Sequence, residues 1–281
     1  MSGIIRSFIM LTIFMIFAVQ AHSHTIITRT SDRQNISLSQ LAAAAGKSDL
    51  VLLGESHDNK DHHDLQLEVI RSLLANNPKL AIGLEMIQAG YQRQLDEWSA
   101  GNISEPLMQA IFEANWSDWR MYRDIFIFAR DNKIPMVALN VPIDIVKKVS
   151  MYGFASLTPE ERKDLPKGTS CDLNNPQIAI LKNSFQAVPN HVQNGKLFNN
   201  FCEAQTVRNS GMAINIVRYL EKYPERKIVA LTGIWHAVKY AIPDQMERYG
   251  SKLSSTVILP ETPHLNSSNT STSDADYLVE L

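Results

Sequence analysis

Two segments of this chain share one pattern, and that pattern limits the fold more than any other feature. In each, a short apolar run ends at the sequence Gly-x-x-His. Gly54-Glu55-Ser56-His57 follows the run Leu50 to Leu53, and Gly233-Ile234-Trp235-His236 follows the run Lys227 to Thr232. Such runs are typical of buried parallel strands. We expect each glycine to let the chain turn sharply at positive φ. The pattern therefore predicts a histidine just past the end of each of two strands.

Strand-like and helical segments alternate along the chain, which indicates the fold class. Lys79 to Leu84 and Met136 to Leu139 are further apolar runs of strand length, and Ser255 to Leu259 is expected to be the last strand. Segments with helical periodicity separate the strands, for example Asp61 to Asn76. This alternation predicts an α/β fold with a mostly parallel central sheet that is flanked by helices.

Polar side chains just past the apolar runs form the first candidate site. They are Glu55, His57, Glu85, Asn140 and His236. In a parallel sheet, ligands bind outside the carboxyl ends of the strands, so we expect these side chains to converge on one crevice. Two imidazoles with one or two carboxylates suit a divalent metal, which could activate water. Without a metal, a His–Glu pair could act as a general base. The simpler alternative is that Glu55 and His57 cap the next helix and hydrogen-bond each other.

The helix after the first Gly-x-x-His segment carries two more histidines, His62 and His63, in its first turn. Asn59, His62 and Gln66 lie at near-helical spacing, which would place them on the face nearest the strand end. First-turn residues of a helix are usually solvated. We therefore expect His62 and His63 to be exposed to solvent.

The ends of the chain differ in composition from its middle. Arg6, the apolar run Phe8 to Val19 and small residues near Ala21 predict a signal peptide at residues 1–21 and an exported protein. No cysteine follows the run, so no lipid anchor is expected; the alternative is an uncleaved signal that anchors the chain. The last residues, 262–281, are rich in Ser, Asn, Thr and Asp, which predicts a flexible tail.

The intervening residues 22–261 are expected to form a single domain. Residues 143–226 contain no clear strand, which predicts a helical insertion that covers the carboxyl edge of the sheet.

The chain has two cysteines, Cys171 and Cys202. An even number in an exported chain favours a disulfide, worth roughly 3–4 kcal/mol for a loop of about 30 residues; the alternative is two buried thiols. The formal net charge of −2, with both signs interspersed, argues against a nucleic acid partner.

Several motifs in order along the chain resemble those of one protein family. They are Gly54 to Asn59, Gly83 to Met86, Ala138 to Pro142, Ala204-Gln205 with Met212-Ala213, and Gly233 to His236. Together they resemble the ChaN-like haem-binding uptake proteins. The superfamily also holds the Tiki metalloproteases, the TraB proteins and erythromycin-esterase-like enzymes. The resemblance implies export to the bacterial periplasm or cell envelope and a role in haem or iron acquisition.

The resemblance also implies a cofactor, partners and site residues. Haem binding in the family involves a tyrosine ligand to the iron, a nearby histidine and haem-linked dimerisation, with outer-membrane or periplasmic uptake components as possible partners. Tyr122 and Tyr152 flank the expected helical insertion and are candidate ligands, with Tyr91 as a third. His191, before the long helix, is the candidate partner histidine.

The superfamily offers a second function. In the Tiki branch, Gly-x-x-His histidines and a glutamate are thought to hold a divalent metal for peptide cleavage. His57, His236, Glu85 and Glu55 match that set residue by residue, as metal ligands and as catalytic residues. The alternative to a haem-binding protein is therefore a hydrolase that depends on a metal such as Zn, Mn or Co. The resemblance favours a binding protein over an enzyme.

Overall fold

We describe a computed structural model of the chain, which covers residues 25–77, 79–163, 165, 169–176, 178–179, 181–182, 185 and 195–281. The expected signal peptide and His191 lie outside the described residues. Within them, no helix combines the length and the apolar character needed to cross a membrane.

One eight-stranded sheet organises the molecule, in the order β2-β1-β8-β7-β3-β6-β4-β5. The six strands from β8 to β5 run parallel, whereas β1 is antiparallel to β8 and β2 is antiparallel to β1. The predicted α/β fold with a mostly parallel sheet is confirmed. The strands are β1 Ile26–Arg29, β2 Asn35–Ile36, β3 Leu50–Glu55, β4 Leu80–Gln88, β5 Met136–Asn140, β6 Lys227–Gly233, β7 Ser255–Pro260 and β8 Tyr277–Glu280.

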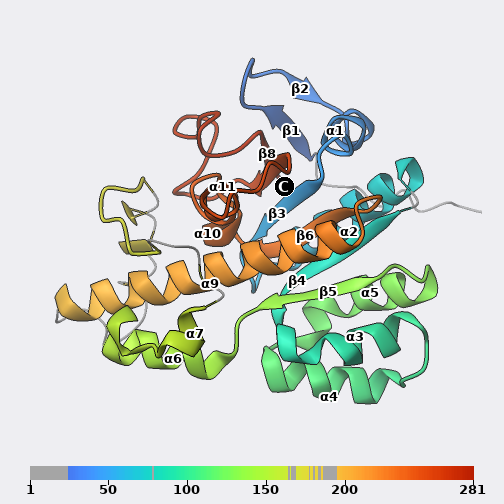
Figure 1. Cartoon of the computed structure of the whole chain (residues 1–281). Coiled ribbons are helices and arrows are strands. Elements are labelled where there is room, and N and C mark those ends of the chain that lie inside the picture. Colours follow the sequence, from blue (N-terminus) through green and yellow to red (C-terminus); the bar gives the residue numbers. More distant parts are fainter. Residues whose placement is uncertain are drawn as a thin grey trace, which may run out of the picture.

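Helices cover both faces of this sheet (Figure 1). One apolar core lies between the sheet and helices α1 to α5, and the other lies between the sheet and α9 to α11. The helices are α1 Leu38–Ala45, α2 Lys60–Asn76, α3 Gln92–Ser99, α4 Glu105–Asn115, α5 Trp119–Asp131, α6 Ile143–Tyr152, α7 Pro159–Arg162, α9 Gly195–Lys222, α10 Ile234–Ala237 and α11 Ile242–Arg248, with short 3-10 helices at Ala89–Tyr91 and Phe154–Ser156.

The continuous apolar run of β3 follows from its position between these two cores. Successive side chains of a strand point to opposite faces of the sheet. Val51 and Leu53 accordingly join the core under α2, whereas Leu50 and Leu52 join the core under α9. Because both faces are covered, every residue of β3 is buried, including Glu55 at its carboxyl end.

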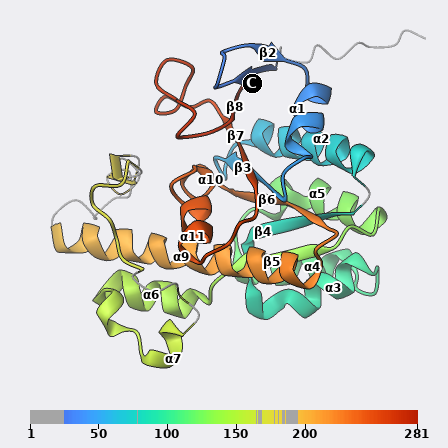
Figure 2. The same ribbon diagram turned by 45° about the horizontal axis from the view of Figure 1, so that its top comes forward.

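The long helix α9 links the sheet to the region before it. Its later turns pack Met212, Ile216 and Leu220 into the core on one face of the sheet. Its earlier part extends beyond the sheet and lies beside α6 and α7 (Figures 1 and 2). The described residues of 143–226 form no strand, as expected. The predicted disulfide between Cys171 and Cys202 is present, with the Cα atoms 5.6 Å apart.

The prediction of a flexible tail at residues 262–281 is wrong. Strand β8 pairs with β7 on one side and with β1 on the other, inside the sheet. The polar residues before it fold into hydrogen-bonded turns, in which Asp274 accepts bonds from the backbone and hydroxyl of Ser271. The composition of the segment suggested disorder because its few apolar residues are spread among Ser, Asn, Thr and Asp, yet Leu265 and Ala275 are buried and β8 joins the sheet.

Strand β4 is also longer than its apolar run suggests. It continues to Gln88, so Glu85 lies within the strand and not past its end. The pairing with β5 shifts register between Leu84 and Gln88. Glu85 is completely buried, which is tolerated only where a carboxylate has charged or hydrogen-bonding partners.

Candidate functional site

Glu55, at the end of β3, is the centre of the first half of the site. Its Oε1 atom lies 2.7 Å from Nδ1 of His57 and also accepts a hydrogen bond from the hydroxyl of Tyr122. Its Oε2 atom accepts a bond of 2.7 Å from the amide of Gln66 and lies 3.4 Å from Nδ1 of His63. Both carboxylate oxygens are therefore engaged by side chains from α2, α5 and the turn after β3.

The proton equilibria of this half favour a charged carboxylate. Burial alone would raise the pKa of Glu55, but hydrogen bonds from His57 and His63 outweigh it and hold the pKa below its usual range. Burial likewise opposes protonation of His57, yet the bond to Glu55 and the charge of Glu85 raise the pKa of that imidazole. The His57 side chain is 38% exposed, so it is the part of this half that a ligand can reach.

Glu85 is the centre of the second half. Its Oε1 atom lies 2.5 Å from Nη2 of Arg208, on α9, and 3.5 Å from Nε2 of His236. Its Oε2 atom accepts a bond of 2.7 Å from the backbone N–H of Gly233. Nδ1 of His236 lies 2.5 Å from Oδ1 of Asn209. This carboxylate is thus neutralised by a guanidinium and a backbone donor.

Burial disfavours the charged form of both ionisable groups in this half, but it prevails only for His236. It would raise the pKa of Glu85, but contact with His236, the Arg208 guanidinium, His57 and the backbone N–H of Gly233 together hold that pKa below its usual value. For His236 burial dominates and lowers the pKa to about 3. His236 is therefore neutral at physiological pH, and Arg208 carries the positive charge beside Glu85.

The two halves meet at Gly233. A Cβ atom on Gly233 would lie 2.9 Å from Nε2 of His57 and 3.7 Å from Oε2 of Glu85. Glycine is therefore required because the imidazole approaches the backbone closely. The expected reason was different and was wrong: φ of Gly233 is −55°, and neither Gly233 nor Gly54 has a positive φ. At Gly54 the constraint is again close packing, here against Leu259.

The structure brings together the five polar residues that the sequence placed at strand ends. Asn140 takes part by donating 2.8 Å to the carbonyl of Glu85. The alternative reading of Glu55 and His57 is half correct, since they do bond each other. The cap of α2 is Asn59, however, whose side chain accepts a bond from the N–H of Asp61.

The prediction that His62 and His63 are exposed is wrong. Both are buried, at 4% and 1% exposure. Nδ1 of His62 accepts a bond of 2.9 Å from the N–H of Ser56, and Nε2 of His63 lies 3.1 Å from the carbonyl of His57. The first turn of α2 thus holds the Gly-x-x-His turn in place. His62 and Gln66 both face the end of β3, as their near-helical spacing had indicated.

Sequence reasoning missed Arg208 and Asn209. A signal for Arg208 was nevertheless present. It lies midway between Ala204 and Met212 at helical spacing, so a charged residue interrupts the apolar stripe of α9. A cation on the buried side of a helix needs an acidic partner, which here is Glu85. Nothing in the sequence indicated that Asn209 would contact His236.

The donor set does not fit a divalent metal. Each carboxylate has both oxygens committed, and the Arg208 guanidinium occupies the position beside Glu85 where a cation would bind. Among the residues that the structure describes, no group of three or more His, Cys, Asp or Glu side chains is arranged to hold a metal ion. The geometry therefore favours a metal-free network over the metal site proposed for His57, His236, Glu85 and Glu55.

The candidate tyrosines lie in very different surroundings. Tyr122 is 1% exposed and donates its hydroxyl to Glu55, and burial together with the Glu55 charge raises its pKa. Tyr152, at the end of α6, is 69% exposed. Tyr91 is partly buried. Of the three, Tyr152 is the most exposed to solvent.

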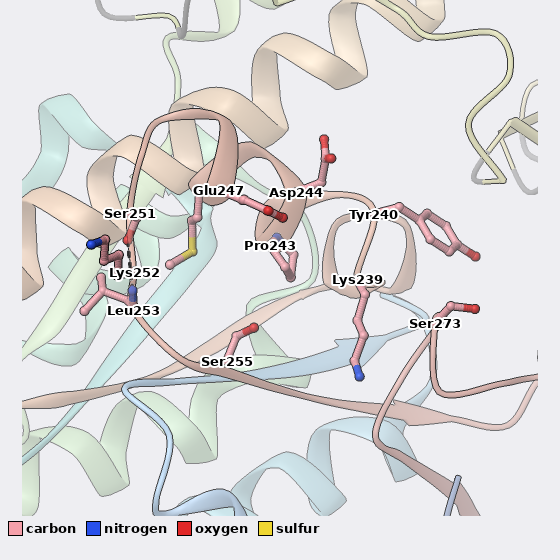
Figure 3. Close-up of a pocket in the computed structure, with 11 residues that line it drawn as sticks. Lys239, Tyr240, Pro243, Asp244, Glu247, Ser251, Lys252, Leu253, Ser255 and Ser273 are labelled. Carbon is pink, nitrogen blue, oxygen red and sulfur yellow. Dashed lines mark hydrogen bonds between the residues drawn. The ribbon is translucent and has the colours of Figure 1, made fainter. Parts of the chain in front are cut away.

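Two hollows of similar size open at the surface. One, of about 610 Å³, lies beside His57 and is lined by parts of the β3–α2 turn, α10 and the segment after β7. The other, of about 600 Å³, lies beside α11 (Figure 3). The ammonium of Lys239 in the second hollow is paired with Asp276 at 2.6 Å. We consider the first hollow the better candidate site because it alone borders the buried network.

Known proteins resemble this chain in sequence or in fold. The structure of ChaN from Campylobacter jejuni with cofacially bound haem matches with a TM-score of 0.74 at 20% identity, covering 91% of this chain and 96% of that one. An erythromycin esterase mutant in its open conformation matches with a TM-score of 0.48 at 15% identity, covering 92% of this chain and 82% of that one. At 20% identity the match to the Campylobacter jejuni structure shows the fold alone.

One curated protein matches part of the chain. It is the chloroplastic protein RETICULATA-RELATED 5 of Arabidopsis thaliana, 25% identical over 122 residues. The match covers 41% of this chain and only 16% of that protein, so the chain spans a small part of that relative's length.

A family model gives broader coverage. The family described as haem-binding uptake, Tiki superfamily, ChaN matches residues 41–246, which is more than half of the chain and includes both Gly-x-x-His segments. The resemblance inferred from the ordered motifs is confirmed. The chain belongs to the ChaN family of haem-binding uptake proteins in the Tiki superfamily.

Proposed function

We propose that this protein binds haem and acts in haem or iron uptake in the bacterial cell envelope. Membership of a haem-binding family supports the first part. The observation that carries the site is the exposure of Tyr152, which at 69% is the most exposed of the three candidate tyrosines. Tyrosine is an established axial ligand of haem iron, and its anionic oxygen suits ferric iron.

The C-terminal end of α6 offers the other features that a haem needs. Met151 and Tyr152 are 59% and 69% exposed, and Ile143, at the start of the helix, is 46% exposed. Lys147 is exposed one turn before Met151. We call Ile143, Lys147, Met151 and Tyr152 the α6 face. Apolar side chains suit the macrocycle, and a lysine suits a propionate.

The buried network is a poor alternative for the iron. Haem would have to displace the hydroxyl of Tyr122 from Glu55 and enter a fully packed core. Leaving Glu55 without that donor would cost on the order of 1–3 kcal/mol. The α6 face requires no such rearrangement.

A relative of known structure supports a further part of the proposal. The Campylobacter jejuni protein binds haem cofacially. An exposed tyrosine occupies one side of a haem and leaves the other open, so a second copy of the chain with its own haem could cover it. We therefore propose a haem-linked homodimer that exchanges haem with outer-membrane or periplasmic components, after export directed by residues 1–21.

Haemin titration of the mature chain tests this function. We expect a Soret band that saturates at about one haem per chain. Tyr152→Phe should weaken binding by about 100-fold, or about 2.7 kcal/mol, because it removes the iron ligand. Tyr249→Phe is the matched control, since Tyr249 is also exposed, at 40%. Equal affinities for the wild type and Tyr152→Phe would refute the proposed ligand.

A second candidate function is acid–base chemistry at His57. The observation that favours it is the 2.7 Å contact with Glu55, which fixes the orientation of an imidazole that borders a pocket. A carboxylate-oriented imidazole is a common general base and needs no metal. Hydrolysis of 4-nitrophenyl acetate, measured with EDTA and with added Zn²⁺, tests it. We expect His57→Asn to lose any EDTA-resistant activity; activity restored only by Zn²⁺ would instead support the metal-dependent hydrolase.

A further inference from the structure

A second ligand site is indicated beside the buried network, separate from the α6 face. The pocket beside His57, here called the His57 pocket, has a volume of about 610 Å³. That is within the range of small-molecule sites. It is lined by residues 55–59, His62, Ile234, Trp235 and residues 261–265. None of these residues belongs to α6.

The walls of the His57 pocket combine an apolar surface with one oriented polar group. Ile234, Trp235, Pro263 and Leu265 supply the apolar part. His57 supplies the polar part, and its ring is held by Glu55 at 2.7 Å and edge-on by Trp116 at a centroid distance of 5.0 Å. A pocket with this lining recognises a molecule that has an apolar ring and a hydrogen-bonding group.

The charges of the pocket indicate the sign of the ligand. Asp58 and Glu261 lie on its walls, and its described lining includes no lysine or arginine. Any positive charge on His57 is balanced by Glu55. Arg208, the nearest cation of the network, is engaged by Glu85 and does not line the pocket. An anion such as a haem propionate would therefore meet carboxylates without a compensating cation.

We propose that the His57 pocket binds a small uncharged or cationic organic molecule, which packs its ring against Trp235 and hydrogen-bonds His57. This site is distinct from the haem face and does not depend on it. The molecule would be the substrate if the acid–base chemistry proposed above takes place, but the inference needs only binding. Binding without turnover would leave it intact and would count against catalysis alone.

Three probes that share an indole ring test the proposal: tryptophol, which is uncharged, tryptamine, a cation, and indole-3-acetate, an anion. The readout is protein-observed NMR of the full mature chain, with the Trp235 indole N–H and the His57 ring as reporters. We expect tryptophol and tryptamine to shift both reporters and to bind at least about tenfold more tightly than indole-3-acetate. Tighter binding of the anion, or unshifted reporters with all three probes, would overturn the proposal.

Asp58→Lys provides the matched charge test. Asp58 is exposed, so the substitution should leave the fold intact while adding a cation to the wall. The order of tryptamine and indole-3-acetate should then reverse. A haemin titration in saturating tryptophol tests the separation of the sites, and an unchanged haemin affinity is expected. Competition between haemin and tryptophol would show that the two sites are one.

Discussion

The sheet-edge network and the α6 face both contain a tyrosine, yet the two tyrosines differ in exposure and in hydrogen bonding. In the network, Tyr122 is buried and its hydroxyl donates a hydrogen bond to Glu55. On the α6 face, Tyr152 is exposed beside another exposed apolar side chain, Met151. The difference in exposure and in hydrogen bonding is the reason that Tyr152, and not Tyr122, is the proposed iron ligand.

The two Gly-x-x-His histidines differ in the same way. His57 is partly exposed and its pKa is raised, whereas His236 is 2% exposed and its pKa is lowered to about 3. The same motif thus gives a partly exposed imidazole with a raised pKa, His57, and a buried neutral imidazole, His236. The network thus orients His57, and the proposed haem ligand, Tyr152, lies outside it.

The largest expected effect comes from breaking the network at Glu85. Glu85→Gln leaves Arg208, whose side chain is 14% exposed, without its counter-charge. Loss of one partner of a buried ion pair costs roughly 3–5 kcal/mol. We expect a loss of this size in the free energy of unfolding, measured with urea.

Glu68→Gln is the control for that experiment, since Glu68 is exposed on α2. Its effect should remain within about 0.5 kcal/mol. Folded Glu85→Gln protein should still bind haemin with unchanged affinity, because the α6 face is separate. If Glu85→Gln were as stable as Glu68→Gln, the carboxylate would not support the network as described.

The next largest effect is a contrast in pH dependence between the two histidines. The folded pKa of His236 is lowered, so the unfolded chain binds more protons and stability falls as pH decreases below about 6.5. The folded pKa of His57 is raised, so its contribution is present below about 6.5 and is lost as pH rises through the folded pKa. For the buried His236 the slope is up to about 1.4 kcal/mol per pH unit. The slope from His57 is smaller, because its side chain is 38% exposed and solvent screens its contact with Glu55.

Urea unfolding at pH 5, 6.5 and 8 measures both slopes. His236→Asn should reduce the loss of stability between pH 6.5 and 5, while His57→Asn should reduce the loss between pH 6.5 and 8. This range lies above the usual titration of carboxylates, whose pKa values in the network are lowered further. Identical pH profiles for the two variants would contradict the difference between the histidines.

The smallest expected effect concerns the charge on the α6 face. Lys147→Gln should weaken haemin binding by about fivefold, because an exposed ion pair contributes about 1 kcal/mol or less. The difference from wild type should shrink at high salt. Lys148→Gln is the comparison, since Lys148 is held by Glu161 at 2.8 Å and should contribute less to haemin binding. A larger loss for Lys148→Gln would reverse the assignment.

The sequence predicted the parallel sheet and the meeting of Glu55, His57, Glu85 and His236 because these depend on local patterns. An apolar run followed by a polar residue reports a buried strand end, and parallel strands share an edge. The depth of burial could not be predicted in the same way. Whether a histidine is sealed or exposed depends on distant side chains, such as Asn209 on α9 for His236.

The errors have the same physical origin. Strand β8 is fixed by pairing with β1 and β7, from opposite ends of the chain, so the composition of residues 262–281 was misleading. Tyr122 and Tyr152 were indistinguishable as haem ligands until the fold showed that one hydroxyl points into the core. Long-range contacts, and not local propensity, decide both outcomes.

Resonance Raman spectroscopy of the ferric haem complex tests the central claim most directly, because iron–tyrosinate vibrations report the axial ligand itself. The spectra of the wild type, Tyr122→Phe and Tyr152→Phe should be compared. We predict that the tyrosinate bands persist in Tyr122→Phe and disappear in Tyr152→Phe. Loss of the bands in Tyr122→Phe, with their retention in Tyr152→Phe, would contradict the account and would place the haem at the sheet edge.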